Sequence, residues 1–416
     1  MLNEIDPARI QAIIEKLVSF GTRNTLSNQT DPNRGIGAAR DWIASEMRGF
    51  AAASQGRMTV TVPSYVQEPA SSIPTSTVIS NIIATLHGSS DPGRVYVVSG
   101  HYDSRNSDVD NFIDDAPGAD DDGSGVAVSM ELARIMATRS PAATIMFAAV
   151  AGEEQGLYGS AFMAEQLKNN STMDVQGMLD NDIVGSSTAD DGTKDPFNIR
   201  MFVQGIPPTD TSSEVTARVK VGGESDTPAR ELGRFVADVA SNDVTNMTVQ
   251  MVYRPDRYLR GGDHLSFLRN GFPAVRFTEP HENFAHQHQN VRVVNGVQFG
   301  DLVEFCDFEF NARVAKVNGA VLWSLAQAPG TPKNVAIDTS QLTNNSTLSW
   351  TLDSNAAGYE IVWRPTDLSS WTHVIPVGNV AQATVLLSKD NVDFGVRAVG
   401  SNGYRSPAAF PFSQVP

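Results

Sequence analysis

Apolar positions follow two spacings along the first 325 residues of the chain. Asp6 and Pro7 fit the N-cap and the first residue of a helix, and apolar residues from Ile10 to Val18 then recur at helical spacing. Short apolar runs between turn residues predict strands, with helical patterns between several of them. This alternation is typical of a three-layer α/β/α fold with a mostly parallel central sheet. The predicted helices are residues 38–47, 125–138, 157–168 and 310–325, and the predicted strands are SNIIATLHG, RVYVVSG, ATIMFAAVAG, MLDNDIVG, IRMFVQG and FPAVRFTE.

The pattern changes after the last of these helices, where AQAPGTPKN is typical of a linker. Five following segments alternate apolar and polar residues, which predicts an antiparallel β-sandwich. It resembles a fibronectin type III domain, with Trp350, Tyr359 and Phe394 carrying the likeness. We therefore divide the chain into an α/β domain of residues 1–328 and a β-sandwich of residues 329–416. We expect an accessory domain without chemistry of its own, and binding of a surface or a protein is the alternative.

Composition and charge exclude several classes of protein. Of 416 residues, 41% are apolar and 19% charged, which is typical of a folded chain. The 31 basic and 47 acidic residues leave a net charge of −16, the wrong sign for nonspecific nucleic-acid binding. The longest apolar run, residues 142–151, is shorter than the about 18 residues of a membrane span, so we expect no membrane-spanning segment.

Cysteine usage and the first residues say little about the compartment. Cys306 is the only cysteine, which excludes an intrachain disulfide, and we expect it to be a buried apolar side chain. No signal peptide is visible at the start of this chain, and a removed one would leave the same residues.

Metal-ligand residue types follow four of the predicted strands. His101 and Asp103 follow the second strand, Glu153 and Glu154 follow the third, and Asp182 lies in the fourth, with Asp180 as an alternative. A loop with His281, His286 and His288 follows the last strand. Because ligands bind at the carboxyl ends of strands in open α/β sheets, we expect these side chains to converge. Asp103, two residues from His101, is placed to orient the imidazole ring.

Three consecutive carboxylates, Asp120 to Asp122, precede the helix that begins near Gly125. One of them suffices as an N-cap, and like charges repel unless a cation lies among them. We expect one of the three, Asp120 first, to bridge two metal ions. Glu153 and Glu154 are adjacent and face opposite ways, which suits one metal ligand and one residue that moves protons.

This donor set favours a pair of divalent cations. It is rich in oxygen, poor in imidazole and free of thiolate, which suits zinc first, with manganese or cobalt as alternatives. Two such ions about 3.5–4 Å apart are used by several classes of hydrolase.

The motifs SGHYDS, APGADDDGSGVA, AGEEQGLYGS and NDIVG and the late histidine resemble those of the co-catalytic zinc aminopeptidase family over residues 80–290. That family includes the glutamate carboxypeptidases and the non-catalytic transferrin receptor. The resemblance implies two zinc ions, a peptide substrate cleaved at its amino end, and secretion or a periplasmic location. It implies one zinc on His101, Asp120 and Asp182, a second on Asp120, Glu154 and His288, Glu153 as general base, and Asp103 and Asp121 as supporting residues.

Three further expectations depend on this resemblance. His288 is preferred to His286 as the last ligand, although the sequence around it departs from the family pattern. The peptide bond between Asp120 and Asp121 is expected to be cis. Ile183, Phe277 and Phe284 match positions near the side-chain pocket, which favours an apolar first residue, and Asp263 beside His264 is expected to line the site.

Two alternatives remain at this point. Arg254, Arg257 and Arg260 could receive the terminal carboxylate of a substrate, which would indicate a carboxypeptidase or dipeptidase. A metal-free binding or adhesion protein on the same fold is the second alternative, and the complete ligand set argues against it.

Overall fold

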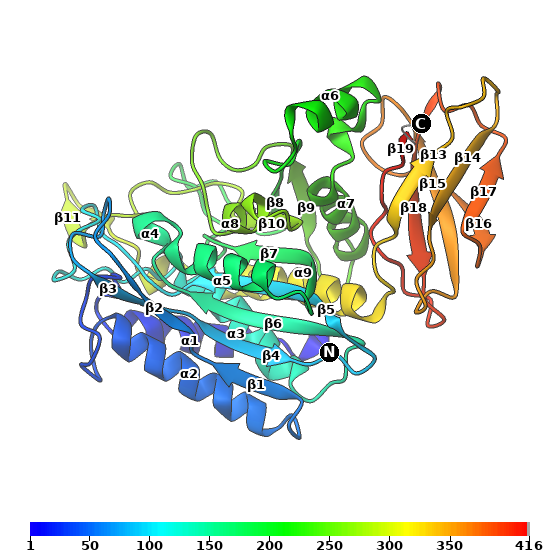
Figure 1. The fold of residues 1–416 in the computed structure, drawn as a ribbon. Helices are drawn as coiled ribbons and strands as arrows, with labels where there is room; N and C mark the ends of the chain where they lie inside the picture. The colour runs from blue at the N-terminus through cyan, green and yellow to red at the C-terminus, as the bar shows by residue number, and fades with distance from the viewer. Residues whose placement is uncertain (414–416) are drawn as a thin grey trace.

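An eight-stranded sheet with helices on both faces forms the centre of the molecule (Figure 1). The computed structural model describes residues 1–413. The strand order is β1-β4-β6-β5-β7-β10-β8-β9, and the four strands β6, β5, β7 and β10 are parallel. Strands β4 and β8 join this block in the antiparallel direction, and β9 runs parallel to β8. The predicted mostly parallel sheet is therefore confirmed.

The helical segments are η1 (Leu2–Glu4), α1 (Pro7–Val18), α2 (Ile36–Ala52), α3 (Gly123–Met136), α4 (Glu153–Gly156), α5 (Tyr158–Asn169), α6 (Ser212–Lys220), η2 (Gly223–Ser225), α7 (Pro228–Ala240), α8 (His264–Arg269), η3 (Val303–Phe305) and α9 (Phe308–Gln327). The strands up to η3 are β1 (Met58–Thr61), β2 (Ser64–Gln67), β3 (Thr77–Ser80), β4 (Ile82–Leu86), β5 (Asp91–His101), β6 (Ala143–Val150), β7 (Asp174–Asn181), β8 (Asn198–Val203), β9 (Thr248–Val252), β10 (Ala274–Thr278), β11 (Arg292–Val294) and β12 (Val297–Phe299).

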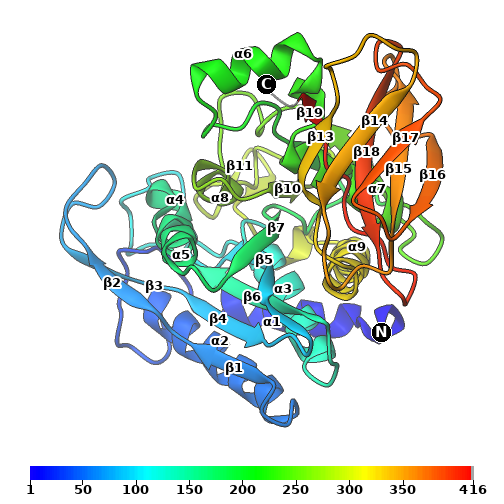
Figure 2. The same ribbon diagram turned by 45° about the vertical axis from the view of Figure 1, so that its right-hand side comes forward.

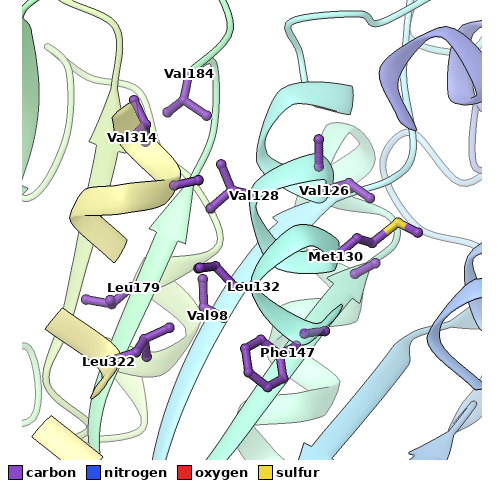
Figure 3. Packing of buried hydrophobic residues seen from close by; sticks show 14 of the residues in the cluster. Val98, Val126, Val128, Met130, Leu132, Phe147, Leu179, Val184, Val314 and Leu322 are labelled. Carbon is purple, nitrogen blue, oxygen red and sulfur yellow. The ribbon is translucent and has the colours of Figure 1, made fainter. Parts of the chain in front are cut away.

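Two apolar cores hold the helices to the two faces of the sheet. The larger core combines α1, α3 and α9 with one face, and the smaller one combines α5 and α8 with the other, in the layers visible in Figure 2. Figure 3 shows Val128 and Leu132 on the side of α3 that faces Val98 of β5 and Val314 and Leu322 of α9. Cys306 is partly buried and packs against the larger core, so the expected buried apolar position is confirmed only in part. None of the helices in the described part of the chain combines the length and apolar character that a bilayer span requires.

The predicted elements of this layered region are present. The first helix begins at Pro7, and the Asp6 side chain accepts a hydrogen bond from the Ala8 backbone N–H at 2.9 Å, as its N-cap position requires. The sequence did not reveal β1 and β9, which form the two edges of the sheet. These strands have four and five residues with only one buried side chain each, so they carry no extended apolar run.

The residues after α9 form two further sheets that face each other. Their strands are β13 (Lys333–Ile337), β14 (Ser346–Thr351), β15 (Gly358–Pro365), β16 (His373–Gly378), β17 (Gln382–Val385), β18 (Val392–Val399) and β19 (Phe412–Ser413). The orders are β17-β14-β13-β19 and β16-β15-β18, antiparallel except where β19 meets β13. Trp350, Tyr359 and Phe394 share the core between the sheets. The exact domain boundary and the likeness to fibronectin type III remain predictions.

A buried ionic cluster joins this β-sandwich to the α/β region. Arg364 of β15 donates to both oxygens of Asp226, at 2.7 and 2.8 Å, and Arg234 of α7 lies 2.9 Å from the same carboxylate. The Trp371 indole N–H donates to Glu231 Oε2 at 2.9 Å. Because the Arg364 side chain is 3% exposed and that of Asp226 is fully buried, removal of one partner leaves buried charge without its full compensation.

We therefore expect Arg364→Met to lower the free energy of unfolding by about 3 kcal/mol, measured by urea unfolding. The control is Arg397→Met, because Arg397 of β18 pairs with Glu360 inside the sandwich and is more exposed. That variant should lose less than about 1 kcal/mol. Equal losses in the two variants would contradict a stabilising role for the ionic cluster.

Candidate metal centre

Five side chains from separate segments converge at the carboxyl ends of the parallel strands. They form two groups, His101 with Asp121 and Asp182, and Asp121 with Glu154 and His288. Within each group the potential ligand atoms lie within 4.8 Å of one another. Asp121 belongs to both groups and therefore lies between them.

His101 is the last residue of β5 and is held from both sides. Its backbone N–H donates to Asp122 Oδ2 at 2.9 Å, and Nδ1 lies 3.1 Å from the Asp103 carbonyl oxygen. Nε2 lies 3.1 Å from Asp121 Oδ1 and 3.9 Å from Asp182 Oδ1. Burial alone would lower the pKa of His101, but contacts with the surrounding aspartates raise it well above its usual value. The ring nitrogen that faces the carboxylates is thus placed as a ligand atom.

The structure corrects the prediction for the aspartate run, since Asp121 and not Asp120 joins the two groups. The Asp120 carboxylate points elsewhere and accepts a hydrogen bond from the Gly185 N–H at 2.6 Å. The cis peptide bond lies between Asp121 and Asp122, one residue later than expected. Asp122 serves as the N-cap of α3 and accepts from the Gly125 N–H at 2.9 Å.

A carboxylate that sequence reasoning missed explains this orientation. Asp301 accepts from the backbone N–H groups of Asp120, at 2.9 Å, and Asp121, at 2.8 Å. Burial raises the pKa of the Asp120 carboxyl group to about 6. Burial and the nearby Asp120 together raise the pKa of Glu279 well above its usual value. No local signal marks Asp301, because it lies in a loop 180 residues beyond Asp121.

His288 closes the second group, whereas His286 does not take part in it. His288 Nε2 lies 2.8 Å from Asp121 Oδ2 and 3.2 Å from Glu154 Oε1. Burial would lower the pKa of His288, but Glu154 and Asp121 raise it to about 11. His286 stacks instead on Phe305, with ring centroids 3.6 Å apart.

Glu153 and Glu154 are the first two residues of the short helix α4, and the Asp103 carboxylate holds their backbone. The backbone N–H groups of Glu153 and Glu154 donate to the Asp103 carboxylate at 3.3 and 3.1 Å. The Asp103 carboxylate lies 3.6 Å from His101 Nδ1, whereas the Asp103 carbonyl oxygen lies 3.1 Å from the same atom. The carbonyl oxygen therefore orients the His101 ring, and the carboxylate mainly holds the turn of Glu153 and Glu154. Burial raises the pKa of both glutamates, in Glu153 well above the usual value.

Arg276 is a buried cation of the site that sequence reasoning missed. Its Nη2 lies 3.0 Å from Asp182 Oδ1 and its Nη1 lies 3.1 Å from Asp256 Oδ2. Burial would raise the pKa of Asp182, but Arg276 lowers it. An arginine inside the strand AVRFT is the signal that could have revealed it, because a fully buried guanidinium needs carboxylate partners. Asp180, the alternative to Asp182, instead accepts a hydrogen bond from the His264 backbone.

The four predicted substrate-binding residues have different environments. Phe277 is fully buried in the larger core, so its prediction as a pocket residue was wrong. Phe284 is 62% exposed, and Ile183 is buried with φ of 60° beside the metal-ligand group. Both carboxylate oxygens of Asp263 are buried without a hydrogen-bond partner within residues 1–413, and burial and Asp180 raise its pKa well above the usual value.

The three arginines of the carboxypeptidase alternative are largely engaged elsewhere. Glu282 lies 3.2 Å from Arg257 and 2.7 Å from Arg260, and the Arg254 guanidinium lies over the Tyr258 ring. Two of the three guanidinium groups are thus already neutralised by a carboxylate.

The donor atoms fit divalent cations. His101 Nε2 and Glu154 Oε1 are buried and form no hydrogen bond within the described part of the chain. Such atoms are costly to bury unless a ligand satisfies them. Imidazole nitrogen and carboxylate oxygen are the donors that zinc accepts, and the shared Asp121 offers one oxygen to each group.

Comparisons with known proteins agree with this geometry. The model of peptidase family M28 matches residues 81–293. A probable zinc metalloprotease of Pyricularia oryzae is 62% identical over 99% of this chain and 83% of its own length. One of Pyrenophora teres f. teres is 59% identical over 99% of this chain and 86% of its own length.

Solved structures share the fold at low sequence identity. The LapA aminopeptidase of Legionella pneumophila has a TM-score of 0.55 at 18% identity, over 78% of this chain and 73% of its own. A glutaminyl cyclase of Fimbriiglobus ruber has a TM-score of 0.56 at 17% identity, over 77% of this chain and 95% of its own. The family match covers the strand ends that carry three of the five converging side chains and the loops that carry Asp121 and His288, and it confirms the resemblance found in the motifs: this chain belongs to peptidase family M28.

Proposed function

We propose that the protein is a zinc-dependent aminopeptidase that binds two zinc ions and removes the first residue of peptides. The observation that carries the proposal is the position of Asp121, which lies between two groups that each contain one histidine and one further carboxylate. The names of the curated relatives support zinc and peptide-bond hydrolysis.

His101, Asp121 and Asp182 would hold one ion, and Asp121, Glu154 and His288 the other. When bound, such a pair of ions polarises a substrate carbonyl and lowers the pKa of a coordinated water. Manganese or cobalt could replace zinc, because both accept the same donors.

Glu153 is the proposed general base. It lies next to the ligand Glu154 but is absent from both ligand groups, so its carboxylate remains free to take a proton from the attacking water. The raised pKa caused by its burial then suits transfer of that proton to the leaving amine. Asp103 holds the turn that presents Glu153 through the backbone N–H at 3.3 Å.

Charge favours a substrate with a free amino group over one bound by its carboxylate. The buried Asp263 carboxylate, which has no hydrogen-bond partner in the described part of the chain, and the partly buried Glu153 carboxylate complement the ammonium of a peptide. Two of the three arginines that could bind a terminal carboxylate, Arg257 and Arg260, are held by Glu282. A preference for substrates with an apolar first residue remains a prediction, supported by Ile183 and Phe284. Secretion of the protein also remains a prediction.

Glu153→Gln tests the base. We expect kcat on aminoacyl-nitroanilides to fall about 10²- to 10⁴-fold, because a neutral amide does not accept the proton. Zinc content, measured by elemental analysis, should stay unchanged. Glu165→Gln, on the exposed side of α5, is the matched control and should keep full activity. Cleavage of N-acetylated peptides from the carboxyl end would instead establish a carboxypeptidase. Conversion of glutaminyl peptides to pyroglutamyl peptides with release of ammonia would establish a cyclase.

His288→Ala tests the second ion. The variant should retain about half of the zinc of the wild type after dialysis, because only one of the two groups loses its histidine. His286→Ala removes a neighbouring histidine of the same loop that stacks on Phe305, and should retain all of it. Equal zinc contents in the two variants would show that His288 is not a ligand.

Chelation tests whether bound zinc stabilises the fold. Removal of zinc leaves buried carboxylates close together, so we expect the melting temperature to fall and to recover when zinc is added back. A ligand at 1,000 times its dissociation constant stabilises a protein by about 4 kcal/mol. Thermal unfolding with and without a chelator measures the effect, and a melting temperature unchanged by both additions would contradict the proposed metal site.

A further inference from the structure

Arg23 lies far from the metal-ligand residues in sequence, yet it is fully buried beneath them. The segment around it runs along the loop that precedes Asp121. The Ala116 N–H donates to the Gly21 carbonyl at 3.0 Å, and the Arg23 N–H donates to Ser104 Oγ at 3.1 Å. Arg23 also lies outside residues 81–293, which the family model matches.

The Arg23 guanidinium connects two loops that carry ligands. Nε donates to the Tyr102 carbonyl at 2.7 Å, and Tyr102 is the residue directly after His101. Nη1 and Nη2 donate to the carbonyls of Pro117, at 2.5 Å, and Gly118, at 2.8 Å, shortly before Asp121. One planar group therefore spans the end of β5 and the loop before α3.

The contacts of Arg23 suit a residue that positions the two loops. All three of these nitrogen atoms bind backbone carbonyls, although the carboxylates of Asp301 and Asp103 lie near enough to act on its charge. Burial lowers the pKa of Arg23 to about 10, so the group stays protonated at neutral pH. A lysine could keep the charge, but it has one nitrogen and cannot reproduce the fork of three donors.

We propose that Arg23 is a positioning residue, which fixes the His101 loop against the Asp121 loop at the separation that zinc binding requires. The inference rests on the proposed zinc-dependent function. His101 Nε2 and Asp121 Oδ1 are 3.1 Å apart, and the two loops that carry them are joined behind the site by this guanidinium. Without the guanidinium, His101 and Asp121 are both still present, but their positions relative to each other are less well fixed.

The test is the zinc dissociation constant of the full chain, measured by competition with a chromogenic chelator well below the melting temperature. We expect Arg23→Lys and Arg23→Met to weaken zinc binding by about 10- to 100-fold, the effect typical of residues that orient ligands. Arg23→Lys keeps the positive charge, and we expect it to bind zinc no more tightly than Arg23→Met. Ser104→Ala, which removes the hydrogen bond to the Arg23 backbone, is a milder variant and should weaken zinc binding in the same direction.

Arg94→Lys is the matched control. Arg94 is 3% exposed and donates to the carbonyls of Leu325 and Ala328 at 3.0 and 2.6 Å, at the opposite end of β5 from His101. Its loss should lower the melting temperature without changing the zinc dissociation constant. Variants of Arg23 and Ser104 that behave like Arg94→Lys would overturn the inference. A wild-type protein that binds no zinc would overturn the proposed function, and this inference with it.

Discussion

The concentration of buried carboxylates at the carboxyl ends of the central strands is the constraint on which the rest of the site depends. Asp121, Asp182, Glu153 and Glu154 meet there with the histidines of the two groups. Like charges this close raise one another's pKa or require cations, and burial removes the screening of water. Contacts with these carboxylates raise the pKa of His101 and His288, and Arg276 places a positive charge 3.0 Å from Asp182. Divalent cations would satisfy the same atoms while leaving the imidazoles neutral.

The fold holds the ligands on strand ends and on loops that have polar anchors. Three of the ligand positions follow directly from the ends of β5, β6 and β7, which are parallel neighbours in one sheet. Two buried carboxylates then hold the loops beyond the strands: Asp301 accepts from the Asp121 backbone N–H, and Asp103 accepts from the Glu154 backbone N–H. The ligands are thus held by groups that are not ligands themselves, as is usual for metal sites.

The sequence revealed what depends on periodicity and chain order, and missed what depends on contacts across the chain. Buried strands and the acidic residues after them are local features, so the central sheet and the position of the site were predictable. The choice between Asp120 and Asp121 was not, because Asp301 decides which carboxylate turns inward. Arg276 and Arg23 were missed for the same reason, since their partners lie in distant segments.

The β-sandwich contacts the end of the sheet that lies away from the site. Lys333 donates to Asp174, the first residue of β7, at 2.7 Å, and Asn355 donates to Asp91, the first residue of β5, at 3.4 Å. His101 ends the same strand, which has eleven residues. At about 3.3 Å per residue, Asp91 at the sandwich contact and His101 in the metal-ligand group are about 33 Å apart along β5. The sandwich therefore supports the amino ends of the central strands, and none of its described residues belongs to the two ligand groups.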